Sequence, residues 1–142
     1  MRAVFIQTIA LLAFAFVPAI GHAIYERQRI HWDEAQLTEN EVTLQQANEW
    51  GESTLWIDAR PDEQFEKQHI PGAISLNEDR WNELLPQTMT AWSPEKRLVV
   101  YCSSQSCALS REVARRLRDE AGLKNVYVLH GGWEAWLEAQ KK

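Results

Sequence analysis

The residues most able to do chemistry in this chain are its two cysteines, Cys102 and Cys107. Four polar residues separate them, an apolar run at 98–101 precedes them and helix-like spacing follows, so Cys102 is predicted at a strand-to-helix junction. Main-chain NH groups at such a junction, together with the positive end of the following helix, favour a negative charge. A thiol held there is biased toward the nucleophilic thiolate. We therefore expect Cys102 to be an exposed nucleophile, although packing as a small buried apolar side chain is the commoner fate of a free cysteine.

Two other kinds of cysteine chemistry can be weighed from the sequence. A zinc site would need two ligands besides the cysteines, and the histidines are single and irregularly spaced, so no metal and no cofactor is predicted. A Cys–His hydrolase would need a histidine that the fold brings close to the nucleophile. Among the four histidines, the sequence leaves two open for that role and gives no motif that requires either. The histidines are His22, His31, His69 and His130, of which His69 and His130 remain open.

Three compact apolar runs, at 55–57, 98–101 and 126–129, are predicted to be the strands that position Cys102. None of these runs alternates apolar and polar residues as a half-exposed strand does. Continuous apolar runs of this kind are typical of parallel strands covered on both faces. A further strand is predicted at 74–76. The fold class is therefore α/β.

Helices are predicted between these strands. Thr43 is a candidate cap for a short helix over 43–50 with Gly51 as its stop, and a longer amphipathic helix covers 109–121 with Gly122 as its stop. In the longer helix Leu109 is expected on the buried face. Another helix is predicted around 81–85, ending near Pro86.

Composition and charge limit the classes of protein. The chain has 142 residues, 45% of them hydrophobic, which fits one globular domain. A net charge of −5 without a basic cluster gives little support to a nucleic-acid partner.

The N-terminal segment is predicted to be a targeting sequence. Arg2 precedes an apolar stretch, and Gly21-His22-Ala23 places small residues at a cleavage site, so residues 1–23 are interpreted as a signal peptide cleaved after Ala23. The alternative is an uncleaved membrane anchor over residues 3–20, in which case the protein contacts the membrane. Both place the remainder in the periplasm or otherwise outside the cytoplasm. Residues 24–41 are predicted to be a linker and 42–142 the domain.

Several short motifs occur in a familiar order along the domain. They are Ile-Asp-Ala-Arg at 57–60, Phe65, His-Ile-Pro-Gly-Ala at 69–73, Tyr101-Cys102 and Gly131-Gly132 with Trp136. In order and spacing they resemble the rhodanese homology domain, over roughly residues 42–140.

The resemblance implies a three-layer α/β/α fold with a five-stranded parallel sheet and a rhodanese-type sulfurtransferase activity, like that of thiosulfate sulfurtransferase. The Cys102 thiolate would take the outer sulfur of thiosulfate or of a persulfide or polysulfide donor, and the resulting persulfide would pass it to a thiol or to cyanide. The partners expected are thus a small-molecule or protein sulfur donor and a thiol acceptor. The resemblance also assigns the active-site loop, which comprises Ser103, Ser104, Gln105, Ser106 and Cys107.

Other matching positions are expected to support the loop. We interpret Asp58 and Arg60 as mainly structural rather than as substrate contacts. Pro71-Gly72 is predicted to reverse the chain, and Gly131-Gly132 to allow a tight strand-to-helix turn. Trp133 and Trp136 are expected to pack.

The loop also departs from the family pattern. Many active members have a glycine three residues after the nucleophile and an arginine five after, where this chain has Gln105 and Cys107. The loop cation is therefore missing, and Arg111 is the residue expected to substitute for it in part. A related phosphatase and arsenate-reductase group has an arginine six residues after the cysteine, where this chain has Ala108, so phosphatase activity is disfavoured.

Cys107 supports an alternative function. A second thiol five residues from a reactive one is a candidate resolving cysteine, which would form a disulfide with Cys102 and release the sulfur or reduce a partner. The protein would then be an exported thiol–disulfide redox protein. A third alternative is a non-catalytic rhodanese-like binding module.

Overall fold

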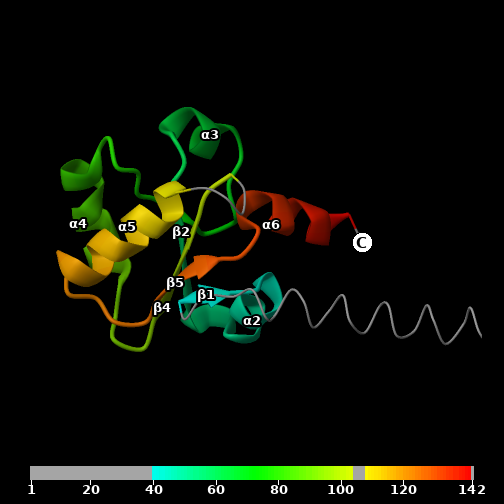
Figure 1. Cartoon of the computed structure of the whole chain (residues 1–142), viewed down its shortest axis with the longest axis horizontal. Helices are drawn as coiled ribbons and strands as arrows, with labels where there is room; N and C mark the ends of the chain where they lie inside the picture. Colours follow the sequence, from blue (N-terminus) through cyan, green and yellow to red (C-terminus); the bar gives the residue numbers. More distant parts are fainter. Residues whose placement is uncertain (1–39, 104–107, 142) are drawn as a thin grey trace, which may run out of the picture. The chain divides into compact units, whose positions relative to one another are not determined.

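The computed structural model describes residues 40–103 and 108–141, and within them it contains a five-stranded, all-parallel sheet (Figure 1). The strand order is β1-β5-β4-β2-β3, so the strand that leads into Cys102 lies at the centre. The strands are β1 (Glu41–Val42), β2 (Thr54–Asp58), β3 (Ile74–Ser75), β4 (Arg97–Tyr101) and β5 (Val126–Leu129). The predicted α/β class and five-stranded parallel sheet are confirmed.

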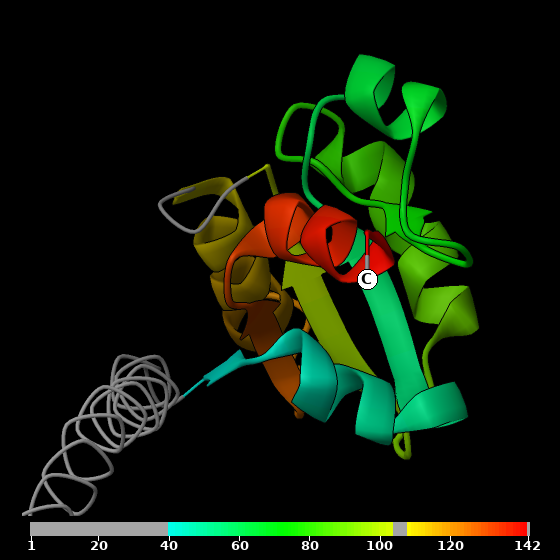
Figure 2. The ribbon, with the colours of Figure 1, turned by 90° about the vertical axis from the view of Figure 1, so that its right-hand side faces the viewer.

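Helices cover both faces of the sheet. Figure 2 looks from the side of α2 and α6, with the sheet behind them. Residues of α4 and α5 pack in the core cluster of the opposite face, where Val113 and Leu117 are fully buried. The helices are α2 (Leu44–Glu49), α3 (Asp62–Lys67), α4 (Trp81–Ala91), α5 (Ala108–Asp119) and α6 (Gly132–Gln140), with a short 3-10 turn η1 (Gly51–Ser53).

The central strand β4 divides its side chains between the two faces. Leu98 and Val100 belong to the cluster under α4 and α5, whereas Val99 and Tyr101 belong to the cluster under α2 and α6. All four are fully buried, which explains why the run shows no polar alternation. Burying each such side chain contributes roughly 1.5–3 kcal/mol. The strand that leads into Cys102 is therefore covered on both faces.

The ends of the two predicted capped helices are as expected. Thr43 caps α2 in a capping box: its side chain accepts from the Gln46 N–H, and the Gln46 side chain accepts from the Thr43 N–H. Gly122 lies just past α5 with φ +68°, a left-handed conformation that favours glycine at a helix end.

Four details differ from the sequence-based expectation. Helix α4 continues beyond Pro86 to Ala91, because the proline removes only its own N–H bond while the buried Trp81 and Thr88 hold both halves of the helix on the core. Leu109 is 38% exposed, since it lies on the first turn of α5 and belongs to neither core cluster. Glu41, expected in the linker, is the first residue of β1. Helix α3 was not predicted.

The predictions for the N-terminal segment fall on residues that the structure does not describe. The signal peptide or anchor at 1–23 and nearly all of the linker at 24–41 are outside residues 40–103 and 108–141. No helix within those described residues is long and apolar enough to cross a membrane.

Candidate active site

Cys102 directly follows β4, at the carboxyl end of the central strand. Its side chain continues the alternation of Leu98 and Val100 and joins their core cluster, so the residue is only 1% exposed. The expectation of an exposed sulfur is therefore wrong for this structure. The reason is the strand itself: a residue two positions beyond Val100 points to the same covered face.

The chemical state of Cys102 in the structure is a disulfide. Cys107, the other cysteine of the chain, lies outside the described residues, as do Ser104, Gln105 and Ser106. The predicted cradle of loop NH groups therefore falls outside them as well, and the predicted resolving role of Cys107 stays a prediction.

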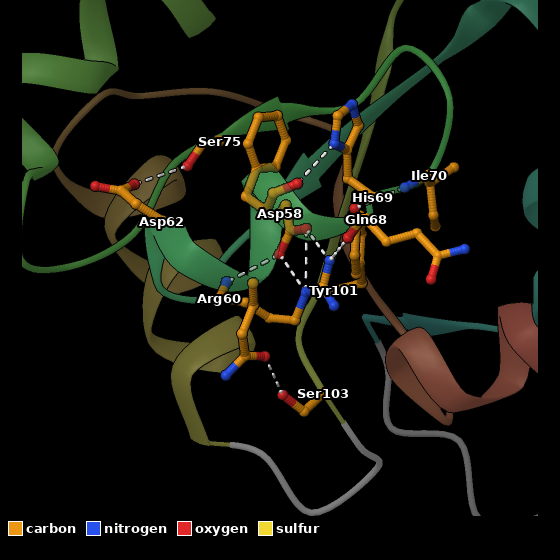
Figure 3. A network of polar contacts seen from close by, with 11 residues as sticks. Asp58, Arg60, Asp62, Gln68, His69, Ile70, Ser75, Tyr101 and Ser103 are labelled. Carbon is orange, nitrogen blue, oxygen red and sulfur yellow. Dashed lines mark hydrogen bonds and ion pairs between the residues drawn. The ribbon is translucent and has the colours of Figure 1, made fainter.

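The first turn of α6 fixes the backbone at the start of the loop. The Trp133 N–H donates to the Cys102 carbonyl at 2.7 Å, and the Glu134 N–H donates to the Ser103 carbonyl at 3.3 Å. These are amides that a helix N-terminus leaves without intrahelical partners. The Ser103 hydroxyl, which is exposed, also donates to the Gln64 side chain on α3 at 3.1 Å (Figure 3). Contacts with α3 and α6 therefore hold Cys102 and Ser103 where the chain leaves the sheet.

The turn that begins α6 depends on two glycines. Gly131 and Gly132 have φ values of +76° and +55°, in the left-handed region that favours glycine. A Cβ at Gly131 would lie 2.8 Å from the Cβ of Ala135. The predicted tight strand-to-helix turn is confirmed, and it is what brings the Trp133 N–H to the Cys102 carbonyl.

A buried ion pair supports the loop from β2. Arg60 Nη2 lies 2.6 Å from Asp58 Oδ2, Arg60 Nε donates to both oxygens of Asp58, and the side chains are 4% and 0% exposed (Figure 3). Arg60 Nη2 also donates to the Gln68 carbonyl at 2.7 Å. Burial by itself lowers the pKa of Arg60, but the hydrogen bond and charge of Asp58 outweigh that effect and raise it, so the guanidinium stays charged. This geometry agrees with a structural role for the pair, because almost none of it is accessible to substrate.

Arg60 also links the end of β2 to aromatic side chains of β4 and α6. Its guanidinium lies over the Trp133 ring at 4.4 Å and the Tyr101 ring at 5.5 Å from the centroids. The Tyr101 hydroxyl accepts from the Ile70 N–H at 3.1 Å, and burial raises the pKa of Tyr101, so the hydroxyl stays neutral. Trp133 in turn stacks on Trp136, with 4.9 Å between the ring centroids, so both tryptophans pack as predicted.

His69 belongs to the supporting frame of the site. Its Nδ1 lies 2.8 Å from the Phe65 carbonyl, and its ring stacks on the Phe65 ring at 4.1 Å. The Ala73 N–H donates to the Ile70 carbonyl and Gly72 has φ +82°, which confirms the turn predicted at Pro71-Gly72.

Arg111, the predicted substitute for the missing loop cation, is half exposed on α5 and pairs with Glu41 on β1. Its Nη1 lies 3.4 Å from Glu41 Oε1, and His130 Nδ1 lies 3.6 Å from Glu41 Oε2. The sequence analysis left His130 open and missed Glu41. The signal that could have found them is the position of His130 directly before Gly131-Gly132, at the end of a predicted strand.

Metal binding has no geometric support in the described part of the chain. No group of three or more His, Cys, Asp or Glu side chains that could hold a metal ion occurs within residues 40–103 and 108–141.

Comparison with known proteins identifies one family and several similar structures. The rhodanese-like domain family matches residues 41–139. The structure is similar to that of a protein from Bacillus halodurans, with a TM-score of 0.60, 25% identity and coverage of 82% of each chain. It is also similar to a thiosulfate sulfurtransferase from Pseudomonas aeruginosa, with a TM-score of 0.58, 27% identity and coverage of 74% of this chain and 19% of that one.

Curated relatives match a shorter part of the chain. A tRNA uridine(34) hydroxylase from Yersinia pestis (strain Pestoides F) is 33% identical over 81 residues, which are 56% of this chain and 22% of the relative. One from Hamiltonella defensa is 31% identical over 90 residues. This chain therefore spans about a fifth of the length of these relatives. The family match over residues 41–139, together with the central strand that leads directly into a cysteine and the glycine turn that braces it, shows that the chain belongs to the rhodanese-like domain family.

Proposed function

We propose that this protein is a sulfurtransferase that carries sulfur on Cys102. The observation that carries the proposal is the position of Cys102, at the carboxyl end of the central strand β4 with its carbonyl bound by the first turn of α6. Ligands of open parallel sheets bind beyond the carboxyl ends of the strands. The family supports the same chemistry, since one similar structure is a thiosulfate sulfurtransferase.

The reaction has two steps. The Cys102 thiolate attacks the outer sulfur of thiosulfate, so that a Cys–S–S⁻ persulfide forms and sulfite leaves with the electron pair of the broken sulfur–sulfur bond. An acceptor thiolate then attacks the terminal sulfur, which yields the acceptor persulfide and regenerates the Cys102 thiolate. A persulfide or polysulfide donor reacts in the same way, with a thiolate or shorter polysulfide as the leaving group. Because Cys102 is disulfide-bonded in the structure, reduction must precede the first step.

Mass spectrometry of the intact protein tests this proposal. The reduced wild type, treated separately with thiosulfate and with polysulfide and then freed of small molecules, should gain the mass of one sulfur atom. Dithiothreitol or cyanide should remove that sulfur. The Cys102→Ser variant should gain nothing under the same conditions, and Cys107→Ser should still gain one sulfur. If the wild type gains no sulfur from any donor, the protein is not a sulfurtransferase and the binding-module alternative gains support.

Thiol–disulfide exchange is a second candidate function, favoured by the disulfide at Cys102. A Cys107 thiolate would attack the inner sulfur of the Cys102 persulfide, forming the internal disulfide and releasing hydrosulfide. The Cys107→Ser variant should then keep its persulfide longer than the wild type does. Equal persulfide lifetimes in the two proteins would rule out this resolving role.

We also propose that the domain acts outside the cytoplasm, on a small-molecule or protein sulfur donor and a thiol acceptor. The basis is the apolar stretch followed by Gly21-His22-Ala23 in the sequence. Sequencing the N-terminus of the mature protein should give Ile24. Intact Met1 in membrane fractions would favour the anchor instead.

A further inference from the structure

Three charged or titratable groups outside the supporting frame lie near the end of the sheet that carries Cys102. They are Glu41 on β1, His130 directly after β5, and Arg111 on α5, with Glu41 between the other two. The side chains of Glu41 and His130 are only 10% and 17% exposed. None of the three is explained by the supporting role of Asp58 and Arg60.

The strand register places His130 beside Cys102. Val100 on β4 is the Cα partner of Val128 on β5. Cys102 lies two positions after Val100, and His130 lies two positions after Val128. Side chains two positions apart point to the same face, and Val100, Val128 and Cys102 all belong to the cluster under α5. The His130 N–H still donates to the Val42 carbonyl at 2.8 Å, so its backbone continues the ladder beyond β5. Cys102 and His130 are thus neighbours at the end of adjacent strands, on the same side of the sheet.

The His130 ring is held from its other side. Nδ1 lies 3.6 Å from Glu41 Oε2 and is a buried nitrogen without a hydrogen bond in the described structure. An N–H on this nitrogen could donate to the Glu41 carboxylate after a shift of a few tenths of an ångström. Nδ1 is thus directed at β1, on the far side of β5 from the strand that leads to Cys102.

Two charged side chains of the described residues lie around the ring. Glu41 on β1 is the negative group facing it, and Arg111 on α5 binds the other oxygen of the same carboxylate at 3.4 Å. Arg111 is half exposed and already paired, so its charge is largely satisfied by Glu41 and screened by solvent. A proton on His130 would therefore add one net positive charge at the end of β5, beside the strand that leads to Cys102, in a chain that has Cys107 where many relatives of this type have a loop arginine.

We propose that His130, held by Glu41, supplies the positive charge that keeps Cys102 as a thiolate and as a persulfide anion. This inference rests on the proposed sulfurtransferase function and specifies how this chain performs it. Because histidine changes charge between about pH 5 and 8, the reactivity of Cys102 becomes dependent on pH in that range. A loop arginine would give no such dependence.

Alkylation of Cys102 tests the proposal on the full-length chain. The Cys107→Ser protein provides a single thiol, whose rate of reaction with iodoacetamide is followed by intact mass from pH 5 to 9. An opposite charge nearby lowers a pKa by about 1–3 units, so adding His130→Gln should slow the reaction about tenfold near pH 6. At pH 9 the two rates should converge, because the thiol is then largely ionised in both proteins and the histidine is neutral.

Two further variants separate a charge effect from a structural one. His130→Lys keeps a positive charge at all these pH values, so it should restore the fast reaction near pH 6 and keep it at pH 8. Arg115→Gln is the control for loss of a positive charge elsewhere, because Arg115 pairs with Glu112 on the exposed face of α5 and its replacement should not alter the profile. Superimposable profiles for the parent, His130→Gln and His130→Lys would overturn the proposal.

Sulfur loading of the same proteins keeps the two proposals distinguishable. If polysulfide loads Cys102 but the alkylation profiles are identical, sulfur transfer stands and the role of His130 fails. If the profiles differ as expected but no variant takes up sulfur, His130 activates the thiol and the sulfurtransferase function fails.

Discussion

Replacing Arg60 with methionine removes the guanidinium while keeping a long, flexible side chain in its place. Arg60 is 4% exposed, and its partner Asp58 is completely buried. The substitution leaves the Asp58 carboxylate without its cation and leaves the Gln68 carbonyl without the donor at 2.7 Å. The same change removes the guanidinium that lies over Trp133 and Tyr101. We therefore expect a large loss of folding stability.

The size of the loss follows from burial. Removing one partner of a buried ion pair costs about 3–5 kcal/mol, because the remaining charge is left uncompensated in the protein interior. With a urea m-value of about 2 kcal/mol per molar for a small domain, the midpoint of unfolding should fall by about 1.5–2.5 M. Arg60→Lys keeps the charge but not the bidentate geometry, so its midpoint of unfolding should lie between those of the wild type and Arg60→Met.

Urea unfolding followed by tryptophan fluorescence measures this, since Trp133 lies directly under the guanidinium. The double variant Asp58→Asn with Arg60→Met should be less destabilised than the sum of the single variants, because neither leaves a lone buried charge. Arg115→Met is the matched control, because Arg115 pairs with Glu112 on the exposed face of α5 and the loss of that pair should barely move the midpoint. A shift for Arg60→Met as small as that of the control would refute the reasoning from burial.

Three further predictions test other parts of the frame. Gly131→Ala should destabilise the domain by more than Gly72→Ala, because both glycines have positive φ but only at Gly131 would the new methyl group meet another side chain; thermal unfolding of the two variants gives the comparison. Thr43→Ala should cost about 1 kcal/mol through loss of the helix cap, measured by urea unfolding. Arg80 lowers the pKa of Asp62 by hydrogen bonding, so this contribution to stability is complete above the unfolded pKa and is lost as the pH falls through the lowered folded value. Arg80→Gln should therefore lose less stability than the wild type on acidification below about pH 4, in urea titrations at a series of pH values.

The central strands could be predicted because burial on both faces requires an apolar side chain at almost every position. Val126–Leu129 forms β5 with the limits that its apolar run suggests, since a strand covered on both faces must be apolar along its whole length. The turn at Gly131-Gly132 could also be predicted, because few other residues adopt positive φ readily.

The features that could not be predicted depend on contacts between distant segments. β1 has two residues, too few for any periodicity, and it exists because Val42 and Glu41 pair with β5. The proximity of Glu41 to His130 follows from that pairing and not from the local sequence. The burial of Cys102, in contrast, was open to prediction, because Leu98, Val100 and Cys102 continue one alternation.

The bond between the Trp133 N–H and the Cys102 carbonyl has a consequence for biosynthesis. Cys102 leaves the ribosome before the segment that braces it, and at roughly 5–20 residues per second the intervening chain takes on the order of seconds to appear. During that interval the nascent polypeptide lacks the α6 contacts that fix the start of the loop. A fragment that stops short of α6 would therefore lack the Trp133 N–H that holds the Cys102 carbonyl, even where the central strands have already formed.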